Sequence, residues 1–140
     1  CEIPLLIAAR GIMQRIGVRN LFALGLIGAV VRLLGFAGAT SIWQIVPLQL
    51  LHALTFGAYY VGSVTYVALL LPARMKSSAQ TVFAGLTMGL GGLTGLVVWG
   101  YVSEYLGFTA MYWLGGAVAF VGLVVLLAGV PAHPGRTKAR

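Results

Sequence analysis

The sequence predicts an all-α protein, a polytopic bundle of transmembrane helices. Hydrophobic residues make up 60% of the 140 residues and charged residues only 8%, and the mean hydropathy is +0.99. Soluble domains carry about 25% charged residues, so this chain has too few to cover a soluble surface. Its apolar stretches are long enough to cross the ~30 Å hydrocarbon core as helices. They lack the alternating pattern of a membrane barrel, and helices are the other backbone structure that spans a bilayer.

One partial span and four complete spans follow one another along the chain. The apolar run before Arg10 is too short to cross a ~30 Å core, and the chain begins at Cys1 rather than Met. We therefore interpret the first segment as the end of a helix and the chain as a fragment of a larger protein. The expected elements are a partial helix at 1–9, helices at about 21–39, 43–71, 78–102 and 109–130, and a basic tail at 131–140.

Small residues and prolines mark where these spans end. The first complete span runs into the small-residue loop 38–41, and the second carries Pro47 in its first turns and stops at Pro72. Pro131 ends the fourth. The third is rich in glycines at the spacing that allows close helix contact, namely Gly85, Gly89, Gly92 and Gly95.

Lys and Arg residues predict the orientation of the chain. The two loops on one face of the predicted bundle contain neither, and Glu104 lies there instead. Because cytoplasmic loops are enriched in Lys and Arg, we expect the other face, with the C-terminus, in the cytoplasm. Eight of the nine basic residues lie on that face: Arg10, Arg15, Arg19, Arg74, Lys76, Arg136, Lys138 and Arg140.

Three ionisable residues lie inside apolar spans: Glu2, Arg32 and His52. A charge at the bilayer centre costs roughly 2.5–3.5 kcal/mol, so such residues need partners or a water-filled cavity. Arg32 follows Asn20 by 12 residues, which places it roughly 18 Å from the cytoplasmic boundary, near the middle of the bilayer. That depth exceeds the reach of a snorkelling side chain. We predict that the three residues form a polar site inside the bundle.

A polar stripe follows the second complete span at steps of three or four residues, the period of one helix face. Such a stripe on a membrane helix faces a cavity or a ligand more often than lipid. The alternative for His52 is a hydrogen bond between helices without ligand contact. The stripe supplies our cavity-lining candidates: Gln49, His52, Thr55, Tyr59, Ser63 and Tyr66.

Buried ionisable groups on neighbouring spans favour a transporter over other classes of membrane protein. The residues present include no carboxylate pair, no His/Cys cluster and no serine-based triad, so we expect no enzyme, no metal and no cofactor. The net charge of +7 does not predict nucleic-acid binding, because the basic residues adjoin the spans. An exporter with the same architecture and a non-transporting membrane scaffold remain alternatives. The expected partners are the lipid bilayer and a small-molecule solute.

A series of short motifs resembles one transporter family. Taken over its whole length, the chain resembles helices eight to twelve of a major facilitator superfamily symporter, in the branch that contains lactose permease and the 3-phenylpropionate permeases. The motifs, in order, are Glu-Ile at 2–3, Arg-Ile-Gly-Val-Arg at 15–19, Val-Arg-Leu-Leu at 31–34, Gln-Leu-Leu-His-Ala-Leu-Thr-Phe at 49–56, Ser-Ala-Gln at 78–80 and Tyr-Leu-Gly-Phe at 105–108.

The resemblance implies roles for the buried residues. Glu2 and His52 match positions that take part in sugar binding and proton coupling in lactose permease, and Arg32 matches the arginine that faces the proton-carrying acid. Thr55 stands where that acid would be, and a threonine carries no proton at accessible pH. The proton carrier would then be Glu2, His52, which titrates near neutral pH, or an acid on helices that precede this segment.

The resemblance also implies the function of the whole protein. We expect proton-coupled uptake of an aromatic carboxylate, a nucleoside or a sugar across the bacterial inner membrane. Two six-helix halves would alternate access to a midplane site, and this segment would need the N-terminal helices of the same chain as its partner.

Overall fold

The computed structural model describes residues 11–130, apart from the side chains of residues 53 and 54. The expected partial helix at 1–9 and the tail at 131–140 lie outside this range. Every regular element within it is helical, which confirms the all-α prediction for the described residues. After a short helix at 11–16, the elements are α2 (Val18–Gly38), α3 (Ile42–Leu70), the 3₁₀ turn η1 (Ala73–Met75), α4 (Lys76–Ala84), the π-helix η2 (Gly85–Leu90) and α5 (Gly91–Gly129).

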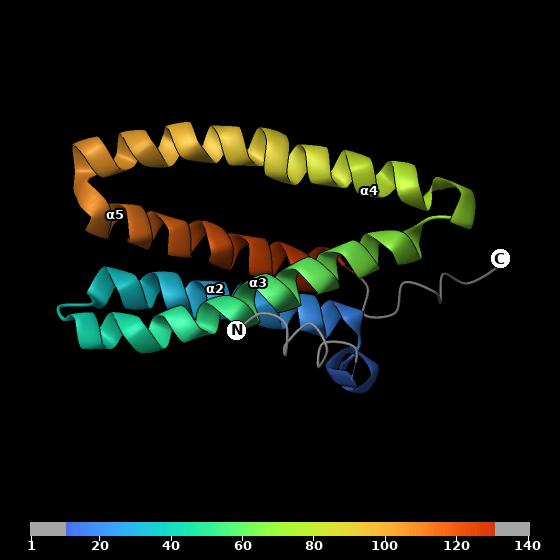
Figure 1. The fold of residues 1–140 in the computed structure, drawn as a ribbon, viewed down its shortest axis with the longest axis horizontal. Helices are drawn as coiled ribbons and strands as arrows, with labels where there is room; N and C mark the ends of the chain where they lie inside the picture. Colours follow the sequence, from blue (N-terminus) through green and yellow to red (C-terminus); the bar gives the residue numbers. More distant parts are fainter. Residues whose placement is uncertain (1–10, 131–140) are drawn as a thin grey trace.

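Three continuous helical stretches are long and apolar enough to cross a membrane: Val18–Gly38, Ile42–Leu70 and Ala73–Gly129. The third has 57 residues, and a straight helix of that length would measure about 85 Å, far more than a bilayer core. It is divided at Gly107, where φ is 82° and ψ is 165°. The chain reverses there into two antiparallel arms (Figure 1).

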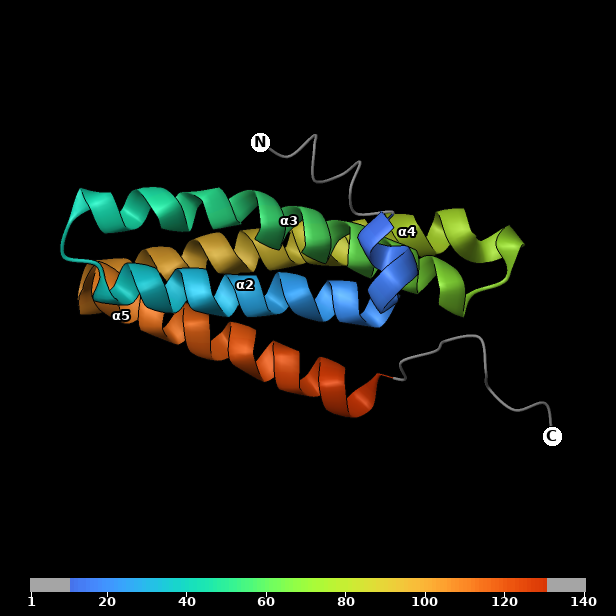
Figure 2. The ribbon, with the colours of Figure 1, turned by 90° about the horizontal axis from the view of Figure 1, so that it is seen from below.

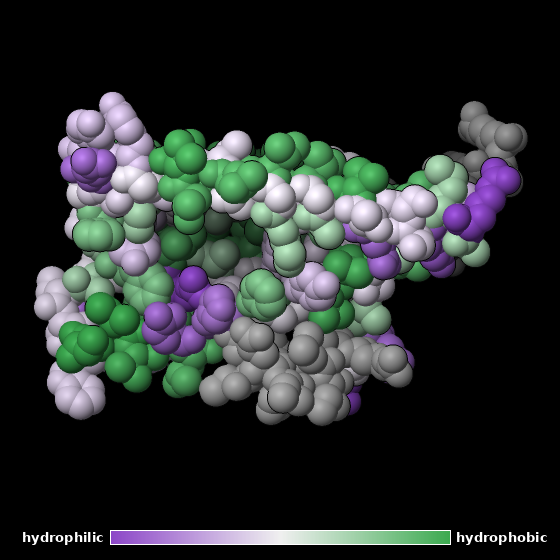
Figure 3. Space-filling model, turned by 45° about the horizontal axis from the view of Figure 1, so that its top comes forward, coloured by the Kyte–Doolittle hydropathy of each residue, from purple (hydrophilic) through white to green (hydrophobic). Residues whose placement is uncertain are grey.

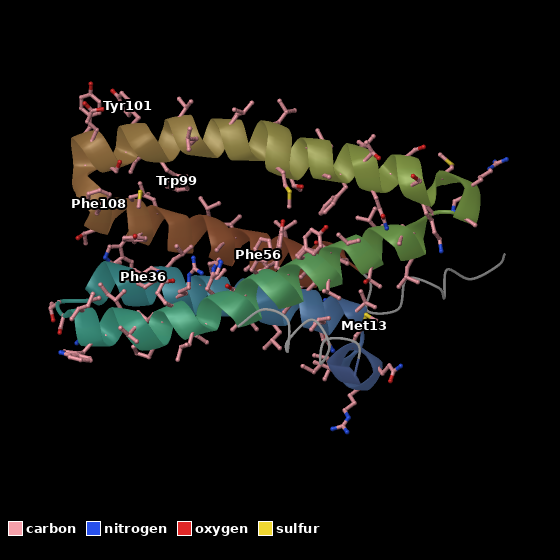
Figure 4. The ribbon with its side chains drawn as sticks, viewed as in Figure 1. Met13, Phe36, Phe56, Trp99, Tyr101 and Phe108 are labelled. Carbon is pink, nitrogen blue, oxygen red and sulfur yellow. The ribbon has the colours of Figure 1, made fainter. Side chains whose placement is uncertain are left out.

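The loop expected at 103–108 is therefore shorter than the sequence indicated. Only Gly107 leaves the helical conformation, and the residues on both sides stay helical. A positive φ is accessible to glycine without steric cost, which allows one residue to turn the chain. Trp99 points from the first arm into the space between the arms, whereas Tyr101 points away from the bundle (Figure 4).

The helix α2 holds the bundle together. It lies between α3 and the second arm of α5 (Figure 2), and both of these contact it along much of its length. Tyr112 of the second arm packs on Phe36 with ring centroids 5.3 Å apart. The first arm with α4 lies farther out (Figure 1), and within this stretch it is α4 that contacts α3.

Glycines let α2 and α3 approach closely. A Cβ added to Gly25 would lie 2.5 Å from the backbone nitrogen of Tyr59, and one added to Gly62 would lie 2.8 Å from Cα of Phe22. Both distances are far below a normal contact with backbone. Leu21 packs beside this crossing and is 1% exposed. Small residues at membrane helix crossings permit this kind of backbone contact.

The glycine face expected to make such a contact, in the third span, does not make one within the described chain. A Cβ added to Gly85, Gly89 or Gly92 meets no atom within 4 Å, and one added to Gly95 meets only Trp99 of the same helix. The spacing predicts a small-residue face, but spacing does not say which helix in a bundle has a neighbour on that face. Glycines of α2 and α3 make the close crossing instead.

Candidate functional site

Arg32 and His52 meet between α2 and α3. A guanidinium nitrogen of Arg32 hydrogen-bonds to Nδ1 of His52. Since a guanidinium only donates, the imidazole nitrogen that faces it is the acceptor in this arrangement. The structure thus brings together two of the three ionisable residues that the sequence placed in one site. The third, Glu2, lies outside the described residues.

Aromatic rings continue from this pair along both helices. The guanidinium carbon of Arg32 lies 5.6 Å from the centroid of the Phe36 ring, a cation–π distance. His52 stacks on Phe56 with centroids 5.9 Å apart, and Phe56 stacks in turn on Tyr60 at the same distance. Phe36 and Phe56 flank the pair along α2 and α3 (Figure 4). Sequence reasoning missed both phenylalanines, although each follows its polar partner by four residues, one helical turn.

The depth of Arg32 differs from the sequence estimate. The helix α2 ends at Gly38, so Arg32 lies about 9 Å by helical rise from that end and about 21 Å from the basic end. His52 lies about 15 Å from the start of α3 at Ile42. The pair therefore sits in the half of the bundle away from the basic end, not at its middle. The contact with His52 supplies the partner that a charged group in an apolar span needs.

A cavity of about 210 Å³ opens beside the pair. Hydrophilic atoms face a recess under the mostly apolar outer helix (Figure 3). Its titratable side chains, among the described residues, are Arg32, His52 and Tyr59. The full lining comprises Gly25, Ala29, Arg32, Leu33, His52, Thr55, Phe56 and Tyr59.

The polar stripe of α3 divides between packing and cavity. Thr55 borders the cavity but is 6% exposed, and its hydroxyl donates to the His52 carbonyl oxygen at 2.9 Å. Ser63 is 1% exposed, and its hydroxyl donates to the Tyr60 carbonyl oxygen at 3.1 Å. Tyr66 is buried. In the described residues, Gln49 is exposed and borders none of the cavities beside the pair.

The packing of α2 explains this division. Thr55 is held where Gly28 leaves room for its methyl group, since a Cβ at Gly28 would lie 2.7 Å from it. A Ser or Thr hydroxyl that donates a hydrogen bond to a backbone carbonyl oxygen one turn earlier needs no other partner inside an apolar interface. Polarity alone therefore did not separate side chains that line a cavity from those that pack between helices.

Comparison with known proteins identifies the family. Residues 1–114 match the model of the MFS_1 like family. The chain belongs to the MFS_1 like family, within the major facilitator superfamily. This confirms the superfamily that the motifs indicated, and with the apolar helices it makes the protein an integral, multi-pass membrane protein in contact with lipid.

The curated relatives are named as transporters or permeases. The chain is 25% identical over 126 residues to an uncharacterized transporter YwbF of Bacillus subtilis (strain 168), and 26% identical over 126 residues to a maltose permease of Geobacillus stearothermophilus; both alignments cover 90% of this chain. It is 24% identical over 137 residues, 96% of the chain, to a raffinose permease of Escherichia coli. The chain spans 32% of the length of each of these relatives. No solved structure matches it.

Proposed function

We propose that the full-length protein is a secondary active transporter that takes up a small organic solute together with protons. The observation that carries this proposal is the Arg32–His52 contact beside a cavity between two membrane-spanning helices. Ionisable groups at such depth mark solute or proton pathways more often than structural sites. The two helices would belong to one of two halves that alternate access to the site.

His52 is the group that would respond to a proton. In the observed contact it accepts from Arg32. Protonation would remove the acceptor and place two cations side by side, so Arg32 would be released toward the cavity. An anionic solute, or a carboxylate such as Glu2, would then gain the guanidinium as a partner, because its planar fork suits a carboxylate. Proton binding at His52 would in this way be linked to solute binding at Arg32.

The solute class within this proposal is an aromatic carboxylate, a nucleoside or a sugar. Two relatives are named as maltose and raffinose permeases, which supports a sugar, whereas the cation and aromatic rings at the site support an aromatic carboxylate. We further propose that the protein lies in a bacterial inner membrane with its C-terminus in the cytoplasm and belongs to the branch that contains lactose permease and the 3-phenylpropionate permeases. The basic residues at one end of the described bundle support that orientation.

The test uses the full-length gene product in proteoliposomes with an inward proton gradient. Uptake of radiolabelled maltose, uridine and phenylacetate is measured for the wild type, Arg32→Gln and His52→Gln, with Arg15→Gln as the matched control because Arg15 is exposed outside the spans. We expect gradient-driven accumulation that Arg32→Gln abolishes and Arg15→Gln leaves intact. Normal kinetics in both site variants would refute the site. Accumulation driven only by the reversed gradient would identify an exporter.

A further inference from the structure

A second cavity adjoins the one beside Arg32 and His52. It lies between α3 and the outer helix formed by α4 and η2, and it measures about 280 Å³. Phe56 and Tyr59 line both cavities. The two spaces are therefore neighbouring compartments on the same face of α3, one with a cation and an imidazole and the other without a charged side chain among its lining residues.

Aromatic surface dominates the second compartment. Phe56 and Tyr60 present nearly parallel rings, 5.9 Å apart and inclined by 6°, and Phe83 faces them from α4. An apolar cavity of about 150 Å³ is enough to hold a benzene ring. Stacked or offset aromatic contacts add to the free energy gained by burying a ring. The size and lining of this compartment fit one planar apolar ring.

Five lining side chains carry polar groups, namely Tyr59, Tyr60, Ser63, Gln80 and Thr87, and two of these bond to carbonyl oxygens of their own helices. The hydroxyl of Thr87 donates to the Phe83 carbonyl oxygen at 2.7 Å, and that of Ser63 donates to the Tyr60 carbonyl oxygen. Gln80 also lines the cavity, and its side chain forms no hydrogen bond with another described residue. A sugar ring carries several hydroxyls, each of which needs a partner when it is buried. The stacked faces of Phe56 and Tyr60 are therefore the feature of this lining that favours an aromatic ring over a sugar.

The π-helix η2 shapes this wall. Its residues Thr87 and Met88 line the compartment, and short π-helical segments occur mostly as single turns, frequently at functional sites. Ala84, directly before η2, also borders the space, and its side chain is a single methyl group. A larger side chain at this position would extend toward the ring faces of α3.

We propose that the compartment between α3 and η2 binds the aromatic ring of an aromatic monocarboxylate, whose carboxylate reaches Arg32 in the adjoining cavity. The inference rests on the proposed function and assigns its substrate class. Ala84 and Thr87 then determine specificity for the ring, while Arg32 recognises the acid. Ring and carboxylate recognition are thus placed on different helices, which allows each to be tested alone.

Binding of radiolabelled phenylacetate and acetate to the purified full-length transporter separates the two parts. Ala84→Leu fills the ring compartment, and Ala79→Leu is the matched control because Ala79 borders a different surface of α4. We expect Ala84→Leu to weaken phenylacetate binding at least about tenfold and leave acetate binding unchanged, since a filled pocket rejects the ring alone. Ala79→Leu should change neither.

Unchanged phenylacetate affinity in Ala84→Leu, or maltose binding that Ala84→Leu weakens, overturns the inference while leaving transport itself intact. The proposed function is overturned by a different result in the uptake assay: wild-type uptake that does not depend on the proton gradient, or Arg32→Gln uptake equal to that of the wild type. A second measurement tests the inference even if Ala84→Leu does not fold. Ala84→Cys in a cysteine-free background is labelled with a methanethiosulfonate reagent, and phenylacetate should slow its labelling but not that of Ala79→Cys. Equal labelling rates with and without phenylacetate contradict the assignment.

Discussion

The guanidinium of Arg32 on α2 donates a hydrogen bond to Nδ1 of His52 on α3. This contact joins residues twenty positions apart on two helices that pack against each other. It gives a cation inside an apolar helix a hydrogen-bond acceptor on the neighbouring helix. The same relationship therefore serves structure and supports a role in coupling.

Replacing His52 by glutamine should separate coupling from binding. The glutamine carbonyl oxygen still accepts from Arg32 but does not titrate. We expect solute exchange without a gradient to continue, while gradient-driven accumulation falls by about tenfold or more, because the titrating group is lost. His52→Phe, which also removes the acceptor, should impair both. Equal gradient-driven accumulation in the wild type and His52→Gln would exclude His52 as the proton carrier.

Adding one methyl group at Gly25 should destabilise the bundle. The new Cβ would meet the backbone of Tyr59 at 2.5 Å, so α2 and α3 would have to move apart, at a cost of roughly 1–3 kcal/mol. Gly89→Ala is the matched control, because its Cβ meets nothing within 4 Å among the described residues. Thermal unfolding in detergent should show a lower midpoint for Gly25→Ala and no loss for Gly89→Ala. The reverse order would contradict the described crossing.

Gly107→Ala should disturb the reversal between the two arms of α5. The residue has φ of 82° and ψ of 165°, a conformation that costs a non-glycine residue about 1–3 kcal/mol. Its space is open, so the effect would come from backbone strain alone. We expect lower thermal stability and faster proteolysis at this turn, with Gly122→Ala, which is helical and uncrowded, as the control. Equal proteolysis rates would show that the turn adopts another conformation.

Arg19 should stabilise the contact between the start of α2 and the end of α5. Its guanidinium donates to the carbonyl oxygen of Leu127, one of the carbonyls at a helix C-terminus that lack an intrahelical partner. A cation there also interacts favourably with the helix dipole, so Arg19→Ala should cost roughly 1–2 kcal/mol of stability. Arg15→Ala, an exposed change of the same kind, should have little effect on the unfolding midpoint. Similar losses in both variants would point to net charge instead of this contact.

Topology reporters should place the basic end in the cytoplasm. Arg74 lies between α3 and α4 and Lys76 is the first residue of α4, whereas the loop after Gly38 carries no Lys or Arg. Because the excess of Lys and Arg orients a polytopic protein, a fluorescent protein fused after Arg140 should fold and fluoresce. Alkaline phosphatase inserted after Ala39 should be active. A non-fluorescent fusion and an inactive phosphatase would show that the chain has the opposite orientation.

Much of the fold followed from patterns within single segments. Apolar length predicted the spans because each must cross the same hydrocarbon thickness, and prolines and small residues bounded them. The turn at Gly107 was expected as a longer loop, since a sequence does not show that one glycine with positive φ suffices. The residues Arg32 and His52 were identified because ionisable groups are rare and costly in apolar spans. Phe56 was missed, because one more aromatic residue in an apolar helix carries no such signal.

By itself the sequence determined the class of this protein: a helical membrane protein whose basic loops share one face and whose spans carry ionisable residues that need partners. These properties depend on how each segment interacts with lipid or water. The hydrophobicity and charge that decide this can be read from the segment's own residues. Only the tertiary structure decided which partners meet. It joined Arg32 to His52, used the glycines of α2 and α3 for the close crossing, and turned half of the α3 stripe into packing. Helix rotation and neighbour choice depend on side-chain fit across the whole bundle, and no single segment contains that information.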